Sequence, residues 1–160
     1  GYSKTDIATV AKTFGMIATM AGGLIGGAIM LRINMKGALV FFGILQAVST
    51  LGFSALPSLP VGISSLALVI AFENLASGMG TAAYSAYMAS LTNKQFTATQ
   101  YALLTALMGV PRVILSSPTG YMSKVMGWEM FFVFCTVIAL PGLLLLMWVF
   151  KLKPAQESAK

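Results

Sequence analysis

Two ionisable side chains lie inside long apolar runs of the sequence. Glu73 follows the run SSLALVIAF, and Arg112 follows the run ALLTALMGVP. A charge in apolar surroundings is costly, so such residues usually face a cavity or a partner. A carboxylate in this setting can bind and release a proton, and a guanidinium can hold a carboxylate through two hydrogen bonds. The chemistry that these two residues offer is therefore proton exchange and anion binding.

The two residues lie at similar depths if both runs are membrane-spanning helices. At 1.5 Å per residue, Glu73 lies roughly 12 Å from one end of its helix and Arg112 roughly 15 Å from the opposite end of the next. This agreement predicts that the two side chains form an ion pair. Two interpretations of Glu73 stay open, a proton-coupling carboxylate and a structural partner of Arg112. Arg112 is correspondingly either an anchor for a substrate carboxylate or a structural cation.

Three further polar residues are candidates for binding a substrate. Asn74 could hydrogen-bond to sugar or amide groups, or it could bridge two helices. Tyr84 could stack on a sugar, although tyrosines near a membrane boundary are common without any ligand. Lys12 begins the first apolar run, where it either reaches a substrate or extends to the interface. Helical spacing places several residues on the face of Glu73, namely Ser77, Gly80, Tyr84 and Tyr87.

The remaining residues with reactive or polar groups indicate no metal or cofactor site. The chain has no histidine and one cysteine, so it offers neither a zinc cluster nor a disulfide framework. Cys135 lies in the run FFVFCTVIAL and is expected to be a small apolar side chain. Gln46 and Ser49 in the second apolar run are expected to hydrogen-bond to neighbouring helices.

The composition is that of a membrane protein. Hydrophobic residues make up 58% of the 160 residues and charged residues 9%, whereas a soluble domain carries roughly 25% charged residues. The net charge is +6, but the ten Lys and Arg residues form no stripe. They fall between apolar runs, where they orient helices. We therefore expect a lipid bilayer as the partner and no nucleic acid.

Five apolar stretches have the length that a bilayer crossing requires, roughly 20 residues. They cover about residues 14–31, 38–56, 65–91, 102–123 and 131–150, and residues 151–160 follow as a tail. No linker or repeat divides the chain. The predicted fold is therefore one all-α domain over residues 1–160, a polytopic transmembrane helix bundle.

Small residues predict which helices lie inside this bundle. Glycines at i and i+4, or in a Gly-x-Gly pair, allow helix backbones to approach closely. On this basis the first, third and fourth helices are expected to be interior, and the apolar fifth is expected to face lipid. The glycines that predict such packing are Gly22, Gly23, Gly26, Gly27, Gly78 and Gly80.

The distribution of Lys and Arg predicts the orientation. With alternating crossings, one side carries Arg32, Lys36, Lys94, Lys151, Lys153 and Lys160. The other carries Lys4, Lys12 and Lys124, diluted by Asp6 and Glu129. The side richer in Lys and Arg is normally cytoplasmic. We therefore expect a cytoplasmic C-terminus, with Lys94 inside and Lys124 outside.

Several motifs of the chain resemble one family closely. FENL at 72–75, GMGTAA at 78–83 and ATQYALL at 98–104 are specific in combination, and the similarity continues through Arg112-Val113, Gly120-Tyr121 and Gly127-Trp128. Together they resemble the anhydromuropeptide permeases of the AmpG type, within the major facilitator superfamily. The resemblance covers essentially the whole chain.

This resemblance implies a fold and a function. The fold has twelve helices in two six-helix halves, of which this chain would supply the last five, as a fragment without the N-terminal half. The function is proton-coupled import (symport) of GlcNAc-anhydroMurNAc muropeptides across the bacterial inner membrane, for peptidoglycan recycling. The expected partners are the muropeptide, protons, the bilayer and the N-terminal half of the same transporter.

Two other classes of function remain as alternatives. One is a related major facilitator carrier of acyl-CoA-like or siderophore cargo, and the other is a non-transporting membrane sensor or scaffold subunit. A membrane-embedded enzyme is disfavoured, because the sequence has no histidine, no metal-binding cluster and no pair of acids at catalytic spacing.

Overall fold

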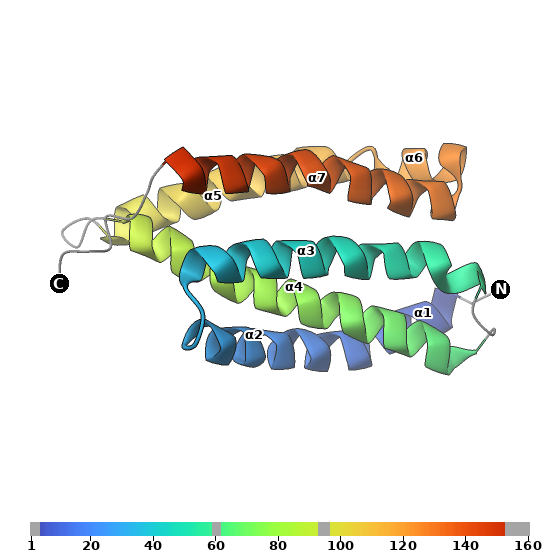
Figure 1. Ribbon diagram of the computed structural model, residues 1–160. Coiled ribbons are helices and arrows are strands. Elements are labelled where there is room, and N and C mark those ends of the chain that lie inside the picture. Colours follow the sequence, from blue (N-terminus) through green and yellow to red (C-terminus); the bar gives the residue numbers. More distant parts are fainter. Residues whose placement is uncertain (1–3, 59–61, 93–96, 153–160) are drawn as a thin grey trace.

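The computed structural model describes residues 4–58, 62–92 and 97–152, and the regular structure in these ranges is helical (Figure 1). The elements, in chain order, are α1 (Lys4–Val10), the π-helix η1 (Ala11–Gly15), α2 (Met16–Met30), α3 (Met35–Ala55), the 3-10 helix η2 (Leu56–Ser58), α4 (Ile63–Leu91), α5 (Thr97–Ser116), α6 (Thr119–Met126) and α7 (Trp128–Leu152). The all-α prediction is confirmed.

Five helical stretches within these ranges are long and apolar enough to cross a membrane, by length and composition. They cover Ile7–Met30, Met35–Ser58, Ile63–Leu91, Ala98–Met126 and Trp128–Lys151. The prediction of five spans is therefore confirmed, although the helices extend beyond the predicted apolar runs. Polar residues at the ends are compatible with a helix that continues into the interface, so apolarity alone sets the boundaries too tightly.

The fourth stretch is not one regular helix. It divides into α5 and α6 at Ser117 and Pro118, where the chain forms a turn. Proline has no N–H to donate to the preceding turn, so it interrupts the ladder of hydrogen bonds. The helix restarts at once, because the Pro118 carbonyl accepts from the N–H groups of Tyr121 and Met122 at 3.1 and 3.0 Å.

Short connections make consecutive elements run antiparallel at two places. Between α2 and α3, the Asn34 side chain accepts a hydrogen bond from the Gly37 N–H at 2.6 Å and caps α3. Between α6 and α7, Gly127 has a φ of 76°. Glycine adopts this left-handed region without steric cost, which allows the sharp reversal.

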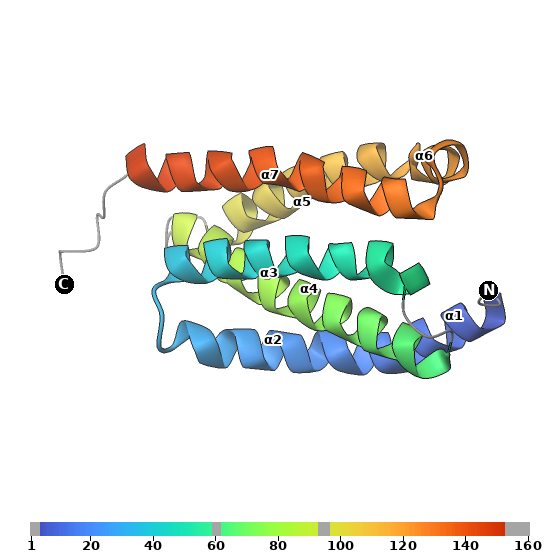
Figure 2. The ribbon, with the colours of Figure 1, turned by 45° about the vertical axis from the view of Figure 1, so that its right-hand side comes forward.

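The long helix α4 is the centre of the bundle, with α2 on one side and α3 on the other (Figures 1 and 2). Its contact with α3 contains the largest core cluster, formed by Ala38, Leu39, Phe42, Met79 and Ala83. A second cluster, nearer the other end of α4, contains Val10, Leu66 and Ile70. The first cluster fixes α3 against α4 on one side of Glu73, and the second fixes α1 against α4 on the other, with Phe53 of α3 packed against it.

Glycines bring the backbones of α2 and α4 into contact. A Cβ added at Gly22 would lie 2.2 Å from the Leu75 carbonyl oxygen, and one added at Gly78 would lie 2.2 Å from the Thr19 carbonyl oxygen. At Gly26 the nearest atom, a backbone Cα of α4, would be 2.8 Å away. No side chain fits at these distances, so the close approach depends on glycine.

The other three glycines expected at this contact lie outside it. A Cβ added at Gly23, Gly27 or Gly80 would meet nothing within 4 Å. Both glycine pairs of α2 have the required spacing, but they point in directions about 100° apart around the helix, and only one pair faces α4.

α3 also contacts α7 along most of its length. The rings of Phe53 and Phe132 stack at 4.8 Å near one end. A Cβ added at Gly43 would lie 2.5 Å from Cδ2 of Leu143 near the middle. At the other end, Lys36 Nζ lies 6.0 Å from the centre of the Phe150 ring.

The expectation that the fourth helix is interior is wrong for this chain. No described side chain of α5 is buried. Since α2 and α3 already occupy two sides of α4, α5 contacts α4 only near its end and diverges from it along the rest of its length (Figures 1 and 2). The largely exposed α7 agrees with the lipid-facing prediction.

The charged residues divide between the two ends of the bundle. The α2–α3 connection and the end of α7 lie at one end, with Arg32, Lys36 and Lys151, while α6 and the start of α7 lie at the other, with Lys124 and Glu129 (Figure 1). The prediction also assigned a side of the membrane to four lysines that lie outside the described residues or whose side chains do, namely Lys94, Lys153, Lys160 and Lys4. Which end is cytoplasmic stays a prediction.

Candidate functional site

The Glu73 carboxylate is half-buried on α4 and is hydrogen-bonded by α3. Gln46 Nε2 donates to its Oε1 at 2.5 Å, and Ser49 Oγ lies 2.6 Å from its Oε2. Thr50 Oγ1 lies 3.4 Å from both oxygens. The three donors are spaced i, i+3 and i+4, which places them on one face of α3. Among the residues that the structure describes, the carboxylate is therefore surrounded by neutral donors rather than by a cation.

The predicted ion pair between Glu73 and Arg112 is wrong. Within the described residues, Glu73 takes its hydrogen bonds from α3, and Arg112 lies exposed on α5 without an ion pair to it. Depth along two neighbouring helices does not fix the direction in which side chains point. Because α5 diverges from α4, the shared depth does not bring the two groups together.

The hydrogen bonds of Ser49 can accommodate Glu73 with or without a proton. Ser49 Oγ lies 2.6 Å from Glu73 Oε2 and 2.8 Å from the main-chain oxygen of Gln46, and a hydroxyl has a single proton to donate. When the carboxylate is ionised, Ser49 donates to it. When Glu73 is protonated, its O–H can donate to Ser49, which then donates to the Gln46 carbonyl. Neither state requires a heavy atom to move.

A pocket of about 350 Å³ lies beside this carboxylate, between α3, α4, α5 and α7. The residues that line it are Leu39, Phe42, Gly43, Gln46, Ser77, Gly80, Thr81, Tyr84, Ser85, Met108 and Leu146. α4 contributes hydroxyl groups, while α3 and α7 contribute mainly apolar side chains. Such a combination suits a ligand with apolar faces and polar edges.

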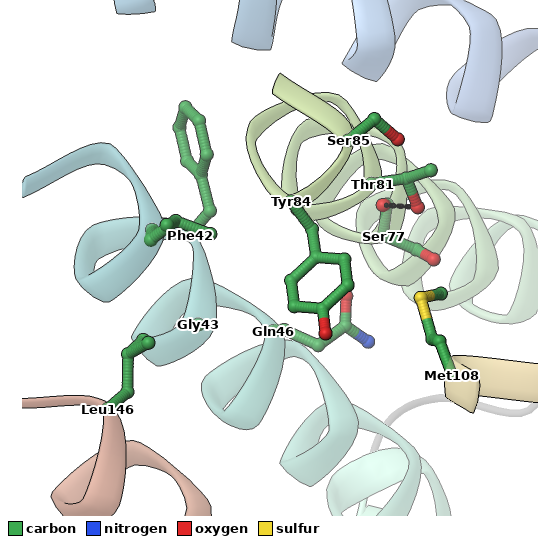
Figure 3. A pocket seen from close by; sticks show the side chains of 11 residues that line it. Phe42, Gly43, Gln46, Ser77, Thr81, Tyr84, Ser85, Met108 and Leu146 are labelled. Carbon is green, nitrogen blue, oxygen red and sulfur yellow. Dashed lines mark hydrogen bonds between the residues drawn. The ribbon is translucent and has the colours of Figure 1, made fainter. Parts of the chain in front are cut away.

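Gln46 belongs to both the pocket and the carboxylate site. In Figure 3 its amide and the ring of Tyr84 point toward the same space, with Met108 on the far side. Its Nε2 is held by Glu73, whereas its Oε1 is buried and has no hydrogen-bond partner among the described residues. A buried acceptor without a partner costs about 1–3 kcal/mol. Apart from its bond to Glu73, the Gln46 amide would therefore be more stable in a position where Oε1 also accepts a hydrogen bond.

Asn74 faces α2 rather than the pocket. Its Oδ1 accepts from Thr19 Oγ1 at 3.1 Å, and its Nδ2 donates to the Ile70 carbonyl at 2.8 Å. A Cβ added at Gly15, at the end of η1, would lie 3.2 Å from Asn74 Nδ2. Of the two roles open from the sequence, the geometry supports the bridge between helices.

The structure brings together only some of the residues predicted from the sequence. Tyr84 lines the pocket with Ser77 and Gly80, and Glu73 adjoins it through Gln46. Lys12 lies exposed in η1, inside the first helical stretch rather than at its beginning. Arg112 lies one turn beyond the pocket residue Met108 on α5.

Sequence reasoning missed part of the site on α3. The expectation that Gln46 and Ser49 bond to a neighbouring helix is confirmed. Their role as the donors to Glu73, together with Thr50, was not predicted. The available signal was the Gln46-x-x-Ser49-Thr50 spacing, which puts three polar groups on one face of an otherwise apolar helix.

Comparisons with known proteins agree with this architecture. The sequence model of the Major Facilitator Superfamily matches residues 1–160 of the chain. The "Anhydromuropeptide permease" of Escherichia coli (strain K12) is 41% identical over 147 residues, which cover 92% of this chain and 30% of that protein. The "Putative transporter AmpG 4" of Rickettsia conorii is 39% identical over 150 residues, 93% of this chain and 36% of that protein.

An "Uncharacterized protein" of Haemophilus influenzae is 40% identical over 167 aligned residues, which cover 100% of this chain and 39% of that protein. The chain thus spans between 30% and 39% of the length of these relatives. Its five apolar helices make it a multi-pass membrane protein. The family match extends over the whole chain, which therefore belongs to the Major Facilitator Superfamily.

Proposed function

We propose that this chain is the C-terminal part of a proton-coupled importer of anhydromuropeptides. The observation that carries the proposal is the Glu73 carboxylate, which lies inside a membrane-spanning helix, has neutral donors and adjoins a hydroxyl-lined pocket. The similarity to the permease of Escherichia coli supports the choice of cargo.

The chemistry of the pocket suits GlcNAc-anhydroMurNAc. Sugar rings have apolar faces and hydroxyl edges, and Phe42 and Leu146 can pack against the former while Ser77, Thr81 and Tyr84 bond to the latter. The peptide part of a muropeptide carries carboxylates. Arg112 is the candidate cation for them, because a guanidinium inside a membrane span requires an anion or water as its partner.

The rest of the transporter would close the pocket. Cavities of major facilitator proteins lie between two halves, near the midplane of the membrane. The exposed α5, with Arg112, and the open side of the pocket would face the N-terminal half, and this chain would supply the last five of twelve helices. From the positive-inside rule we propose that the C-terminus lies on the cytoplasmic side of the bacterial inner membrane.

The coupling step would be carried by Glu73. In the outward-open state the carboxylate binds a proton, and the protonated, neutral group favours the conformational change with substrate bound. After the site opens to the cytoplasm, the proton leaves and Ser49 donates again to the ionised carboxylate. A neutral site during the crossing lowers the electrostatic cost of the movement.

Uptake into membrane vesicles tests the proposal. Vesicles carry the full-length transporter that contains this chain, and accumulation of labelled GlcNAc-anhydroMurNAc is measured with an imposed inward proton gradient. We expect accumulation above the external concentration, abolished by a protonophore and absent from vesicles without the protein. Uptake of a labelled acyl-CoA or siderophore by the same vesicles, with no muropeptide uptake, would point to a carrier of other cargo. Absence of uptake of all three would favour a non-transporting role.

A further inference from the structure

Gln46 is the residue that connects the proposed proton site to the pocket. We propose that Gln46 has two positions: the ionised Glu73 holds its amide, and protonation of Glu73 releases the amide into the pocket, where it binds substrate. This inference rests on the proposed function and deepens it, because it names how the proton and the substrate act on each other.

The observed position of the amide is held from one side only. Gln46 Nε2 donates to Glu73 Oε1 at 2.5 Å, while Gln46 Oε1 is buried without a partner among the described residues. A hydrogen bond to an ionised acceptor is roughly twice as strong as one between neutral groups. The charge on Glu73 thus compensates for the unsatisfied oxygen at the other end of the same amide.

Protonation of Glu73 removes this compensation. The bond from Nε2 then ends on a neutral carboxyl group, and Ser49 can accept the new O–H of Glu73 at 2.6 Å. Since Ser49 then donates to the Gln46 carbonyl, the Thr50 hydroxyl can turn from that carbonyl to Glu73 Oε1, 3.4 Å away, and the Glu73 site keeps its partners without Gln46. The amide gains by rotating toward the pocket that Gln46 already lines, because its Oε1 can accept there from a ligand or from the Tyr84 hydroxyl.

The group that Gln46 would recognise is a hydrogen-bond donor. A free carboxamide oxygen accepts from the hydroxyl of a sugar or the N–H of a secondary amide, and its NH₂ group donates to a hydroxyl or carbonyl. Substrate bound in this way stabilises the released position, which in turn favours the protonated Glu73. Coupling between two sites is reciprocal, so proton and substrate strengthen each other's binding, as symport requires.

No other described ionisable group takes part in this exchange. The hydrogen bonds to Glu73 come from Gln46, Ser49 and Thr50. The charged or titratable residues on the elements packed against α4 lie elsewhere: Lys12 and Arg112 are exposed on η1 and α5, and Lys36 lies over Phe150 at the end of α3. Tyr101 lies near the beginning of α5, and none of the hydrogen bonds to Glu73 comes from it. On α4 itself, Tyr84 lines the pocket and Tyr87 packs edge-on against Phe150, while the side chains of Lys4 and Asp6 on α1 fall outside the described residues.

Binding measurements at two pH values test the coupling. GlcNAc-anhydroMurNAc is titrated by calorimetry into the purified full-length transporter at about pH 4 and about pH 8, between which an ordinary carboxyl group ionises. We expect the wild-type affinity to be at least about fivefold weaker at the higher pH, the lower range of typical coupling between sites. Gln46→Met is expected to bind weakly at both values. Glu73→Gln, which stays neutral, is expected to bind without dependence on pH.

Ser77→Ala is the matched control, because Ser77 lines the pocket but its side chain gives no hydrogen bond to the Glu73 carboxylate. This variant is expected to weaken binding by the same factor at both pH values, so that the pH dependence is kept. Gln46→Asn serves as a second variant if Gln46→Met does not fold, since the shorter amide does not reach both positions. A wild-type pH dependence in either Gln46 variant overturns the proposal.

Infrared difference spectra provide a readout that needs no substrate. The bands of Glu73 are identified by their loss in Glu73→Gln. We expect the carboxylate band of ionised Glu73 to differ between wild type and Gln46→Met, and the C=O band of protonated Glu73 to coincide, because Gln46 has been released. A C=O band that also differs contradicts the release. If the spectra behave as expected but no muropeptide binds, the proposed cargo is wrong and the two positions of Gln46 stand.

Discussion

At the scale of single residues, the exchange of a proton at Glu73 gives a prediction for transport. Glu73→Gln in the full-length transporter should reduce proton-driven accumulation at least tenfold and should reduce exchange of labelled for unlabelled substrate much less. Accumulation requires a group that gains and loses a proton, whereas exchange can proceed with the group permanently neutral. Both rates are measured in the same vesicles, with and without a pH gradient.

Glu129→Gln is the control for this substitution. Glu129 is exposed at the beginning of α7, outside the pocket and the hydrogen bonds of Glu73, so the same change of charge there should alter neither rate. Equal losses of accumulation and exchange in Glu73→Gln, or no loss in either, would remove Glu73 from the coupling mechanism.

The sequence predicted which residue types matter at the site but only part of their arrangement. A carboxylate in an apolar run identified Glu73, because the cost of burying a charge makes such a residue rare without a role. Its partner could not be identified in the same way. Arg112 matched it in depth, yet α5 diverges from α4, and the packing of α3 against α4 placed Gln46 and Ser49 beside the carboxylate instead.

At the scale of helices, the contact between α2 and α4 gives a prediction for stability. Gly22→Ala should destabilise the full-length transporter by about 1–3 kcal/mol, the usual cost of overpacking. Its Cβ would lie 2.2 Å from the Leu75 carbonyl oxygen, which is a rigid backbone atom. The midpoint of thermal unfolding in detergent, followed by circular dichroism, measures the effect.

The neighbouring glycine provides a matched control. A Cβ at Gly23 meets nothing within 4 Å, and alanine is favoured over glycine in a helix by roughly 1 kcal/mol. Gly23→Ala should therefore leave the midpoint unchanged or raise it. A similar decrease in both variants would show that the stability depends on this part of α2 in general and not on the close approach.

Helices were predicted more completely than their irregularities. Five apolar runs of sufficient length identified the five spans, since length and apolarity are what a bilayer selects. The turn at Ser117 and Pro118 was missed, because apolar residues continue on both sides of it. The π-helical turn η1 was missed as well, since it differs from an α-helix in hydrogen-bond pattern and not in composition.

At the scale of the whole molecule, the asymmetry of charge gives a prediction for orientation. Single cysteines replace Arg32 and Lys124, which are exposed at opposite ends of the bundle. The native Cys135 is changed to alanine in both cases. In intact cells an impermeant maleimide should label position 124 and leave position 32 unlabelled, because the end with more Lys and Arg is expected in the cytoplasm.

Permeabilised cells are the control, in which both positions should react. Labelling of position 32 in intact cells, without labelling at 124, would reverse the orientation. This prediction comes from the sequence, since the arrangement of helices shows which charged residues share an end but not which compartment that end faces.

The arrangement of the helices relative to one another was the least accessible to sequence analysis. Apolarity on all sides of a helix hides which face meets a neighbour, so α5 was expected beside α4, and the contact of α3 with α7 was not foreseen. The resemblance to a known family supplied the superfamily, which the match over residues 1–160 confirms.

The contact between α3 and α7 has a consequence for how the protein is made. Its two partners are separated in the chain by η2, α4, α5 and α6, so a ribosome completes four helical elements after α3 before α7 exists. Until then, Phe53, Gly43 and Lys36 on α3 face lipid or the insertion machinery rather than Phe132, Leu143 and Phe150. The helical hairpins of α2, α3 and α4 can assemble during synthesis, whereas α7 can close onto α3 only after the intervening helices have been made.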